Sequence, residues 1–226
     1  MTHKVHPFSH RLGIIRDWKS RWFGPKDKYA QYLKQDVLIR EFLVKRLRGS
    51  YISSIEMERS EKTLRVIIKT SRPGMVIGRS GEGSTKLRED VAKLVKRKGL
   101  NLTQELKLDI EEVRVPEADA SIVAYMVAEG LEKRMPFRRV LKQTVEKVVA
   151  NRDVKGVRIV MSGRLGGADM ARREELKKGQ IPLQTFRADI DFAREKAHLP
   201  YGDIGIQVWI YRGMIFDKDK TATHNA

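Results

Sequence analysis

The sequence predicts an α+β protein in which two compact domains follow a basic N-terminal arm. Helical and strand periodicities alternate along the 226 residues, and hydrophobic residues make up 41% of the chain, enough to build real cores. No apolar run approaches the roughly 18 residues that a membrane span needs. We place the arm at residues 1–37, the first domain at residues 38–115 and the second at residues 116–226.

The charge balance indicates a polyanionic partner. The chain has 46 Lys and Arg residues against 29 Asp and Glu residues, a formal net charge of +17. Such a field attracts nucleic acid first and an anionic membrane surface second. The lack of cysteine excludes disulfides and cysteine-based zinc sites, and MTHKVHPFSH lacks the apolar core of a signal peptide. We therefore expect an intracellular protein with no cofactor, no metal site and no membrane association.

In the arm, basic and aromatic residues are interleaved with little periodicity. Gly13, Gly24 and Pro25 interrupt any long helix. Guanidinium groups and aromatic rings stack on RNA bases, so the arm either lies on RNA or docks as a tail on the protein's own core.

The first domain is predicted in the order helix, strand, strand, helix, helix, strand. Apolar residues recur at helical spacing from Asp36, and Gly49 can end that helix. Alternation predicts strands in YISSIEMER and LRVIIKT. Pro73 then opens a short helix, a long helix runs from about Glu82 to Lys98, and the strand ELKLDIEEVRV ends the domain.

The stretch VIGRSGEGST admits two interpretations. A P-loop requires Lys directly after Gly83, where this sequence has Ser84, and Lys86 comes three residues after that glycine. The alternative is the apolar-apolar-Gly-x-x-Gly loop with which KH domains clamp a nucleic-acid backbone. Because the glycines join two helices and do not directly follow a buried strand, we favour the KH loop. The element order matches the type II form of that domain.

Four residues of this loop are the predicted RNA contacts: Gly78, Arg79, Ser80 and Gly81. The two glycines allow backbone N–H groups to approach phosphates at a helix N-terminus, whose dipole favours anions. Arg79 adds a cation and Ser80 adds a hydrogen-bond donor.

The second domain is predicted to begin with two helices and continue with a strand, a glycine-rich loop, a helical segment and two strands. The first helix runs from Glu117 to Arg134, and Pro136 opens the second. The strand VRIVMSG precedes SGRLGGADMARREE, whose basic part is expected to be helical. LQTFRADIDFA and IGIQVWIYRG are expected to pair around residues 200–202.

In MPFRRVLKQTVEKVVA, apolar residues form a buried stripe and three cations gather on another side. Arg138, Arg139 and Lys142 span about 100° of the helix circumference. Such a group can hold consecutive phosphates, but it is also the pattern of an ordinary solvated helix face.

A series of segments runs from Lys4 to Gly213: KVHP, RLGI, SRPGMVIGRSGEG, FRRVLK, SGRLGGADMAR, FRADIDFA and YGDIGIQVWIYRG. Together they resemble the small-subunit ribosomal protein three family, in its bacterial or organellar form. The resemblance implies a type II KH domain followed by an α/β domain whose mostly antiparallel sheet carries helices on one face. Arg79 and Ser80 stand where family members often carry two lysines, which implies weaker phosphate affinity.

The resemblance also implies a function. It implies a structural, non-catalytic protein in the head of the small subunit, bound to rRNA beside ribosomal proteins two, ten and fourteen. The location would be the bacterial cytoplasm or an organelle. The rRNA-binding candidates are Lys4, Arg11, Arg164 and Arg172.

The same resemblance places Arg138, Arg139 and Lys142 at the channel through which mRNA enters, where they would assist passive unwinding of incoming mRNA. Two alternatives remain, a KH-type RNA chaperone or regulator outside the ribosome and a P-loop nucleotidase.

Overall fold

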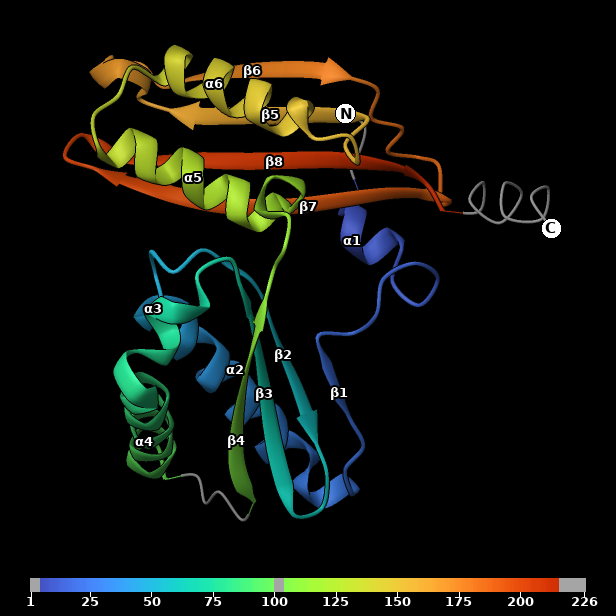
Figure 1. Ribbon diagram of the computed structural model, residues 1–226, viewed down its shortest axis with the longest axis vertical. Coiled ribbons are helices and arrows are strands. Elements are labelled where there is room, and N and C mark those ends of the chain that lie inside the picture. Colours follow the sequence, from blue (N-terminus) through green and yellow to red (C-terminus); the bar gives the residue numbers. More distant parts are fainter. Residues whose placement is uncertain (1–4, 100–103, 216–226) are drawn as a thin grey trace. The chain divides into compact units, whose positions relative to one another are not determined.

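The computed structural model describes residues 5–99 and 104–215, which form two compact units (Figure 1). The first unit spans Trp18–Arg114. The second combines residues 5–17 with residues 115–215, so the residues assigned to the arm divide between the two units. Each unit contains one sheet and several helices, which confirms the α+β class. No helix in the described part of the chain has both the length and the apolar character to cross a bilayer.

The first unit is a four-stranded mixed sheet with helices. Its elements are β1 (Ser20–Trp22), α2 (Lys26–Arg46), β2 (Ile52–Arg59), β3 (Thr63–Thr70), α3 (Pro73–Ile77), α4 (Glu82–Arg97) and β4 (Glu105–Glu112). The strand order is β1-β2-β3-β4, with β2 antiparallel to β3 and the two outer pairings parallel. From α2 onward the elements follow the order predicted from the sequence.

One face of this sheet is covered by α2 and α4. Ile39 and Leu43 of α2 and Val91 of α4 have no exposed surface and pack against Met57 and Val66 of the sheet. Burial of each large aliphatic side chain contributes about 2 kcal/mol. This core fixes α4, and therefore the glycine loop at its N-terminus, on the sheet.

Helix α2 begins at Lys26 and not near Asp36, as its apolar periodicity had predicted. The first ten residues are mostly polar, so they carry no apolar stripe, but they are good helix formers. Pro25 is the N-cap residue, and Asp27 lies in the first turn, where a negative charge is favourable. The added turns bring Tyr32 close to Arg59, whose guanidinium carbon lies 4.4 Å from the centroid of the tyrosine ring.

A buried polar network ties α2 to β1 and β2. Arg59 donates from Nη2 to Oδ1 of Asp36 at 2.7 Å, and Trp22 donates from Nε1 to Oδ2 of the same carboxylate at 2.7 Å. Nη1 of Arg59 also donates to the side-chain oxygens of Gln35 and Gln104. The ion pair is almost fully buried, and these added hydrogen bonds offset its desolvation.

The other face of the sheet carries a charge ladder, formed by Arg21, Glu56, Glu58, Arg65, Lys69, Asp109 and Glu111. Burial raises the pKa of Glu56, but hydrogen bonds from Lys69 and Arg21 outweigh it and leave that pKa below its ordinary value. The resulting stabilisation is present above about pH 4.5 and is lost as the pH falls.

The second unit contains α1 (Pro7–His10), α5 (Ala120–Glu132), α6 (Phe137–Ala150), β5 (Gly156–Gly163), β6 (Arg172–Gly179), β7 (Ala188–Leu199) and β8 (Gly202–Met214). Its sheet has the order β6-β5-β8-β7, and every pairing is antiparallel. The hairpin of β7 and β8 turns at residues 200–201, as predicted.

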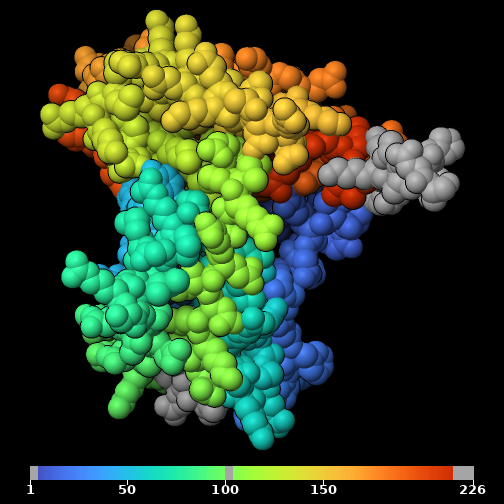
Figure 2. Space-filling model, viewed as in Figure 1, coloured from blue at the N-terminus to red at the C-terminus, as the bar shows by residue number. Residues whose placement is uncertain are grey.

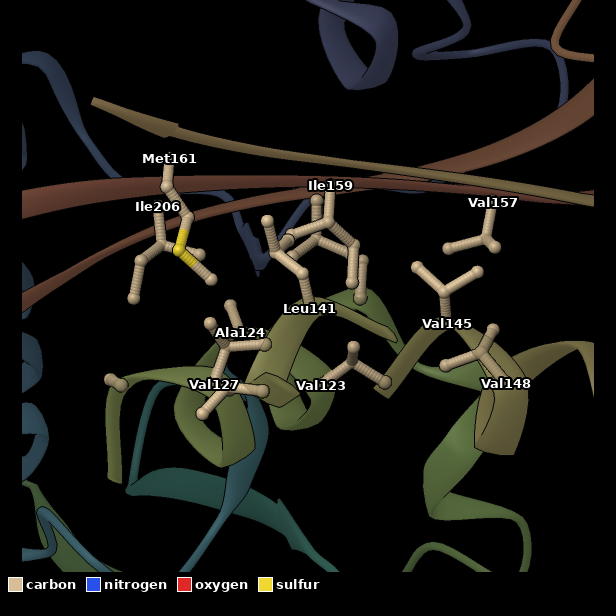
Figure 3. Packing of buried hydrophobic residues seen from close by; sticks show 14 of the residues in the cluster. Val123, Ala124, Val127, Leu141, Val145, Val148, Val157, Ile159, Met161 and Ile206 are labelled. Carbon is tan, nitrogen blue, oxygen red and sulfur yellow. The ribbon is translucent and has the colours of Figure 1, made fainter. Parts of the chain in front are cut away.

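Helices α5 and α6 cover one face of this sheet, which confirms the expected layer arrangement (Figure 1). Figure 3 shows Val123 and Val127 of α5 and Leu141 and Val145 of α6 packed against sheet residues such as Ile159. All five are at most 5% exposed. Because this stripe anchors α6, its remaining surface is presented in a fixed orientation.

The opposite face of the same sheet is covered in part by the chain's first described residues. The rings of His6 and Phe192 meet edge to face with centroids 4.7 Å apart. Phe192 also contacts Trp209, and both are only 8% exposed. The arm was expected either to lie on RNA or to dock on the protein's own core. Residues 6–16 dock on the core.

The basic segment after SGRLGG is a strand, so the expectation of a helix there was wrong. β6 pairs along its whole length with β5, from Gly163 opposite Arg172 to Gly156 opposite Gly179. Arg, Glu, Lys and Leu favour helices, but pairing with the open edge of β5 outweighs that weak preference. Charged side chains are typical of such an edge strand because they prevent pairing with further chains.

Candidate nucleic-acid interface

The glycine loop joins α3 to α4 through a single 3-10 turn, Arg79–Gly81. Gly78 and Gly81 have φ angles of +72° and +81°, and Ser80 has a φ of +50°. A short helix therefore separates β3 from the glycines, as the KH interpretation required and the P-loop interpretation did not allow.

Gly83 is a third glycine that this loop needs. A Cβ atom on it would lie 2.7 Å from the carbonyl oxygen of Val76 and 2.8 Å from that of Ile77. The first turn of α4 can therefore lie directly against the end of α3 only because Gly83 has no side chain. In the sequence Gly83 stands out only as part of the rejected P-loop pattern, so this packing role was not predicted.

The N-terminus of α4 is open to an anion. Its N-cap residue, Gly81, supplies no side-chain hydrogen bond, and Arg79 and Ser80 are exposed beside it. α4 has 16 residues, and Figure 2 shows its side chains on the surface of the unit. Glu82 adds a negative charge to the first turn, 3.4 Å from Lys86. A helix N-terminus without a side-chain cap, with an exposed cation beside it, can bind a phosphate.

Helix α6 presents the three predicted cations away from its core. Arg138, Arg139 and Lys142 are exposed, whereas Val140 and Leu141 between them are buried. Arg138 pairs with Glu174 of β6 at 3.6 Å, and its side chain is 72% exposed. An exposed ion pair of this kind contributes less than about 1 kcal/mol, so a phosphate can displace it.

Strand β6 brings Arg172 to the same place. Arg172 lies 3.5 Å from Glu174, the carboxylate that also pairs with Arg138. The guanidinium carbons of both arginines lie over the ring of Phe137, 5.6 Å from its centroid for Arg138 and 5.4 Å for Arg172. We call Arg138, Arg139, Lys142 and Arg172 the basic cluster.

Arg11 must be withdrawn from the rRNA-binding candidates. It is 0% exposed, and its guanidinium donates to the carbonyl oxygens of Ala188 at 2.6 Å, Pro7 at 3.0 Å and Thr185 at 2.9 Å. No atom of this side chain is accessible to a phosphate. Burial lowers the pKa of Arg11, and the nearby carboxylate of Asp189 opposes that effect.

Arg164, another candidate from that set, keeps part of its side chain exposed. Arg164 donates to the carbonyl oxygens of Ala168 at 2.9 Å and Tyr201 at 3.3 Å, and its side chain is 40% exposed. It therefore supports the SGRLGG loop and still reaches the surface. Lys4 lies outside the described residues.

Two parts of the chain match known families. Residues 38–118 match the KH domain, and residues 127–210 match the family described as ribosomal protein S3, C-terminal domain. The small ribosomal subunit protein uS3 of Caldicellulosiruptor bescii is 46% identical over 223 residues, covering 99% of this chain and 97% of its own length. The chain belongs to the uS3 family.

Further uS3 relatives agree with this assignment. The protein of Clostridium novyi is 42% identical over 99% of this chain and 98% of its own length. That of Lawsonia intracellularis is 44% identical over 97% of this chain and 99% of its own length. The family predicted from the sequence motifs is thereby confirmed, and its two matched regions contain the glycine loop and the basic cluster.

Phe137 lies beside the basic cluster of this uS3 family member, although its sequence pattern placed it only in the buried stripe. The ring is half-buried and contacts the core on one side, while two arginines lie over it. The run RMPFRR, with basic residues on both sides of an aromatic one, is a signal that could have indicated an RNA contact. The approach of Arg172 could not be seen, because the segment had been expected to form a helix.

Proposed function

We propose that this chain binds rRNA in the head of the small ribosomal subunit and contacts incoming mRNA at the channel through which it enters. It is a ribosomal protein and not an enzyme. Its partners are small-subunit rRNA, mRNA and the neighbouring ribosomal proteins two, ten and fourteen. The uS3 relatives named above are bacterial, and we place the chain on ribosomes in the cytoplasm.

The proposal rests mainly on the exposed face of α6. Arg138, Arg139 and Lys142 stand on a helix whose opposite side is fixed in the core, so their positions relative to one another are held. Cations on a rigid helix can bind successive phosphates of one strand without first being ordered, which reduces the entropy cost of binding.

Unwinding by this face is passive. Translocation pulls the message, and the basic cluster binds the phosphates of strands that have already separated, which disfavours their re-pairing. Nothing in this scheme hydrolyses a nucleotide, in agreement with the absence of a P-loop lysine after Gly83. The KH loop, residues 78–81, supplies a second phosphate contact and is assigned to rRNA.

Replacement of Arg138, Arg139 and Lys142 by Ala tests this function. Alanine preserves helix propensity, and the substituted side chains are exposed, so stability should change by about 0.5 kcal/mol or less per site. Small subunits carrying the variant should assemble and translate unstructured messages normally. They should slow on a message with a stable hairpin just ahead of the channel. The measurement is the elongation rate on the paired messages, with and without the hairpin.

The matched control is Lys147, Arg152 and Lys155 changed to Ala, which removes the same charge from exposed positions of the same unit. It should not affect the hairpin message selectively. Equal slowing on both messages, or failure of the first variant to assemble, would contradict the mRNA role and return the three residues to rRNA binding.

A further inference from the structure

A hollow of about 550 Å³ opens in the second unit. It lies among the turn between α5 and α6, the SGRLGG loop and the turn between β7 and β8. Buried side chains of Leu131 and Ile204 form its apolar floor. The volume is in the range of pockets that hold small organic groups.

Two aromatic rings line this hollow, and each faces a glycine of the SGRLGG loop. A Cβ atom on Gly166 would lie 3.8 Å from the ring of Phe137, and one on Gly167 would lie 3.8 Å from the ring of Tyr201. Both glycines have left-handed φ angles, +71° and +80°, so a side chain at either position would be strained. The loop therefore keeps side chains away from the two rings, and Tyr201 is 64% exposed.

Arginines surround the rings. Arg134 and Arg164 line the hollow, and Arg164 also lies over Tyr201, 5.9 Å from the ring centroid. Two carbonyl oxygens hold Arg164 in place, those of Ala168 and Tyr201. Asp169 is the acidic residue that pairs with Arg164, and its side chain is fully exposed, so it neutralises that charge only weakly. Arg138 and Arg172 of the basic cluster lie over the ring of Phe137.

We propose that this hollow accepts one unpaired nucleobase of a single-stranded RNA whose phosphates lie on Arg134, Arg164 and the basic cluster. The base would stack on Tyr201 or Phe137 over the apolar floor. This inference rests on the proposed contact between α6 and RNA, and it gives that contact a base-binding position in addition to phosphate contacts.

The chemistry favours a nucleotide over an apolar side chain of a protein partner. A protein side chain would fill the floor but would add no negative charge for the surrounding guanidinium groups, which among the described residues share only the carboxylates of Asp169 and Glu174. A nucleotide matches both features, because its flat base stacks on aromatic rings and its phosphate pairs with arginine. Binding of this kind is tolerant of sequence, as a strand that moves past the site requires.

The test uses the full chain and a single-stranded RNA of about ten nucleotides that carries one fluorescent adenine analogue. Binding should quench the fluorescence, since the analogue stacks on a ring. Tyr201→Ala should abolish most of the quenching and lower the affinity roughly tenfold. Because Tyr201 is exposed, the variant should keep its circular dichroism spectrum and melting temperature. Photo-crosslinking of a thiouridine-substituted strand to the unaltered chain should label peptides containing Tyr201 or Phe137.

Phe186→Ala is the matched control. Phe186 is an exposed aromatic residue of the same unit, and the 12-residue strand β7 separates it from Tyr201 by roughly 40 Å. This variant should leave the quenching unchanged. An equal loss in both variants, or unaltered quenching with Tyr201→Ala, would overturn the base site and leave the hollow to a protein side chain.

A strand that is abasic at every position separates this proposal from the function on which it rests, because no base remains to stack on a ring. Tyr201→Ala should not weaken binding of the abasic strand, whereas changing Arg138, Arg139 and Lys142 to Ala should weaken binding of both strands. If the hairpin test fails but the quenching is as expected, RNA binds the hollow without the mRNA role. If the hairpin test succeeds but there is no quenching, the base site is wrong.

Discussion

Arg11 and Arg59 are basic side chains with almost no exposed surface. Arg11 donates to backbone carbonyl groups at the start of β7 and just before it, and Arg59 binds Asp36 and two glutamine side chains. The guanidinium group suits both places, because its planar fork reaches several acceptors at once. In a chain with a net charge of +17, a basic residue is therefore not by itself a sign of RNA contact.

Arg11→Ala should destabilise the second unit by about 3 kcal/mol. The substitution leaves a cavity and several buried carbonyl groups without their donor. The measurement is chemical denaturation monitored by the fluorescence of Trp209, which packs in the apolar cluster on this side of the sheet. Trp18 and Trp22 should be changed to Phe in all compared chains, so that Trp209 is the single tryptophan. Arg138→Ala, at an exposed position, is the control and should change the stability by about 0.5 kcal/mol or less. A similar change in both variants would mean that the buried hydrogen bonds of Arg11 contribute little.

At this scale the sequence was informative where the chemistry is local. Gly78 and Gly81 could be identified because the Gly-x-x-Gly spacing and the flanking helices lie in one short stretch. The burial of Arg11 could not be predicted, because its acceptor Ala188 is 177 positions away and nothing in the sequence near Arg11 indicates burial. The hollow around Tyr201 was missed for the same reason, since its rings come from separate turns.

The glycine loop and α4 act together as one element. The helix supplies the dipole and an N-terminus without a side-chain cap, and the left-handed residues shape the loop that precedes it. Gly83 sets how closely α3 approaches, so the loop conformation depends on a residue outside the Gly-x-x-Gly motif.

Changing Arg79 and Ser80 to Asp should weaken RNA binding by this element without unfolding it. Aspartate tolerates the left-handed conformation that Ser80 adopts, and both sites are exposed. Two carboxylates would repel a phosphate at the helix N-terminus. Affinity for an rRNA fragment, measured by titration, should fall at least about tenfold. A charge-assisted hydrogen bond contributes roughly 1.5–3 kcal/mol, and its loss corresponds to a change of that size.

A control with the same charge change is Arg88→Glu with Ala92→Glu, at exposed positions of α4 away from the loop. Each pair lowers the net charge by three, so a general electrostatic effect would weaken both variants equally. That result would show that the loop is only a connection between helices.

At the scale of elements, strong periodicity was a reliable guide and charge was not. The strands β2, β3, β5 and β8 and the helices α4, α5 and α6 lie where apolar spacing placed them. The segment RREELKKG has the composition of a helix, yet it forms β6 because the edge of β5 offers a full set of backbone partners. The early turns of α2 were missed because their residues bury little and therefore show no stripe.

For the whole molecule, the excess charge predicts a steep dependence of RNA binding on salt. If about six phosphates are neutralised on double-stranded rRNA, the slope of log affinity against log salt should be near −5. The measurement is a series of titrations of one rRNA fragment at increasing salt. Binding that hardly changes with salt would contradict the electrostatic account of the +17 charge.

The division of the second unit, with residues 5–17 separated from residues 115–215, has a consequence for synthesis of the chain. The first unit is contiguous, so it can fold as soon as Arg114 has left the ribosome that makes it. Arg11 emerges early but meets its acceptor only when Ala188 has been added, 177 residues later. At about 5–20 residues per second, this takes roughly 10–35 seconds. β8 lies between β5 and β7, so the sheet closes only after β8 has been made. Throughout this interval the basic, partly apolar segment of residues 5–17 has no sheet face to pack on and stays close to the RNA of the translating ribosome. A companion protein that covers this segment would prevent misdirected contacts.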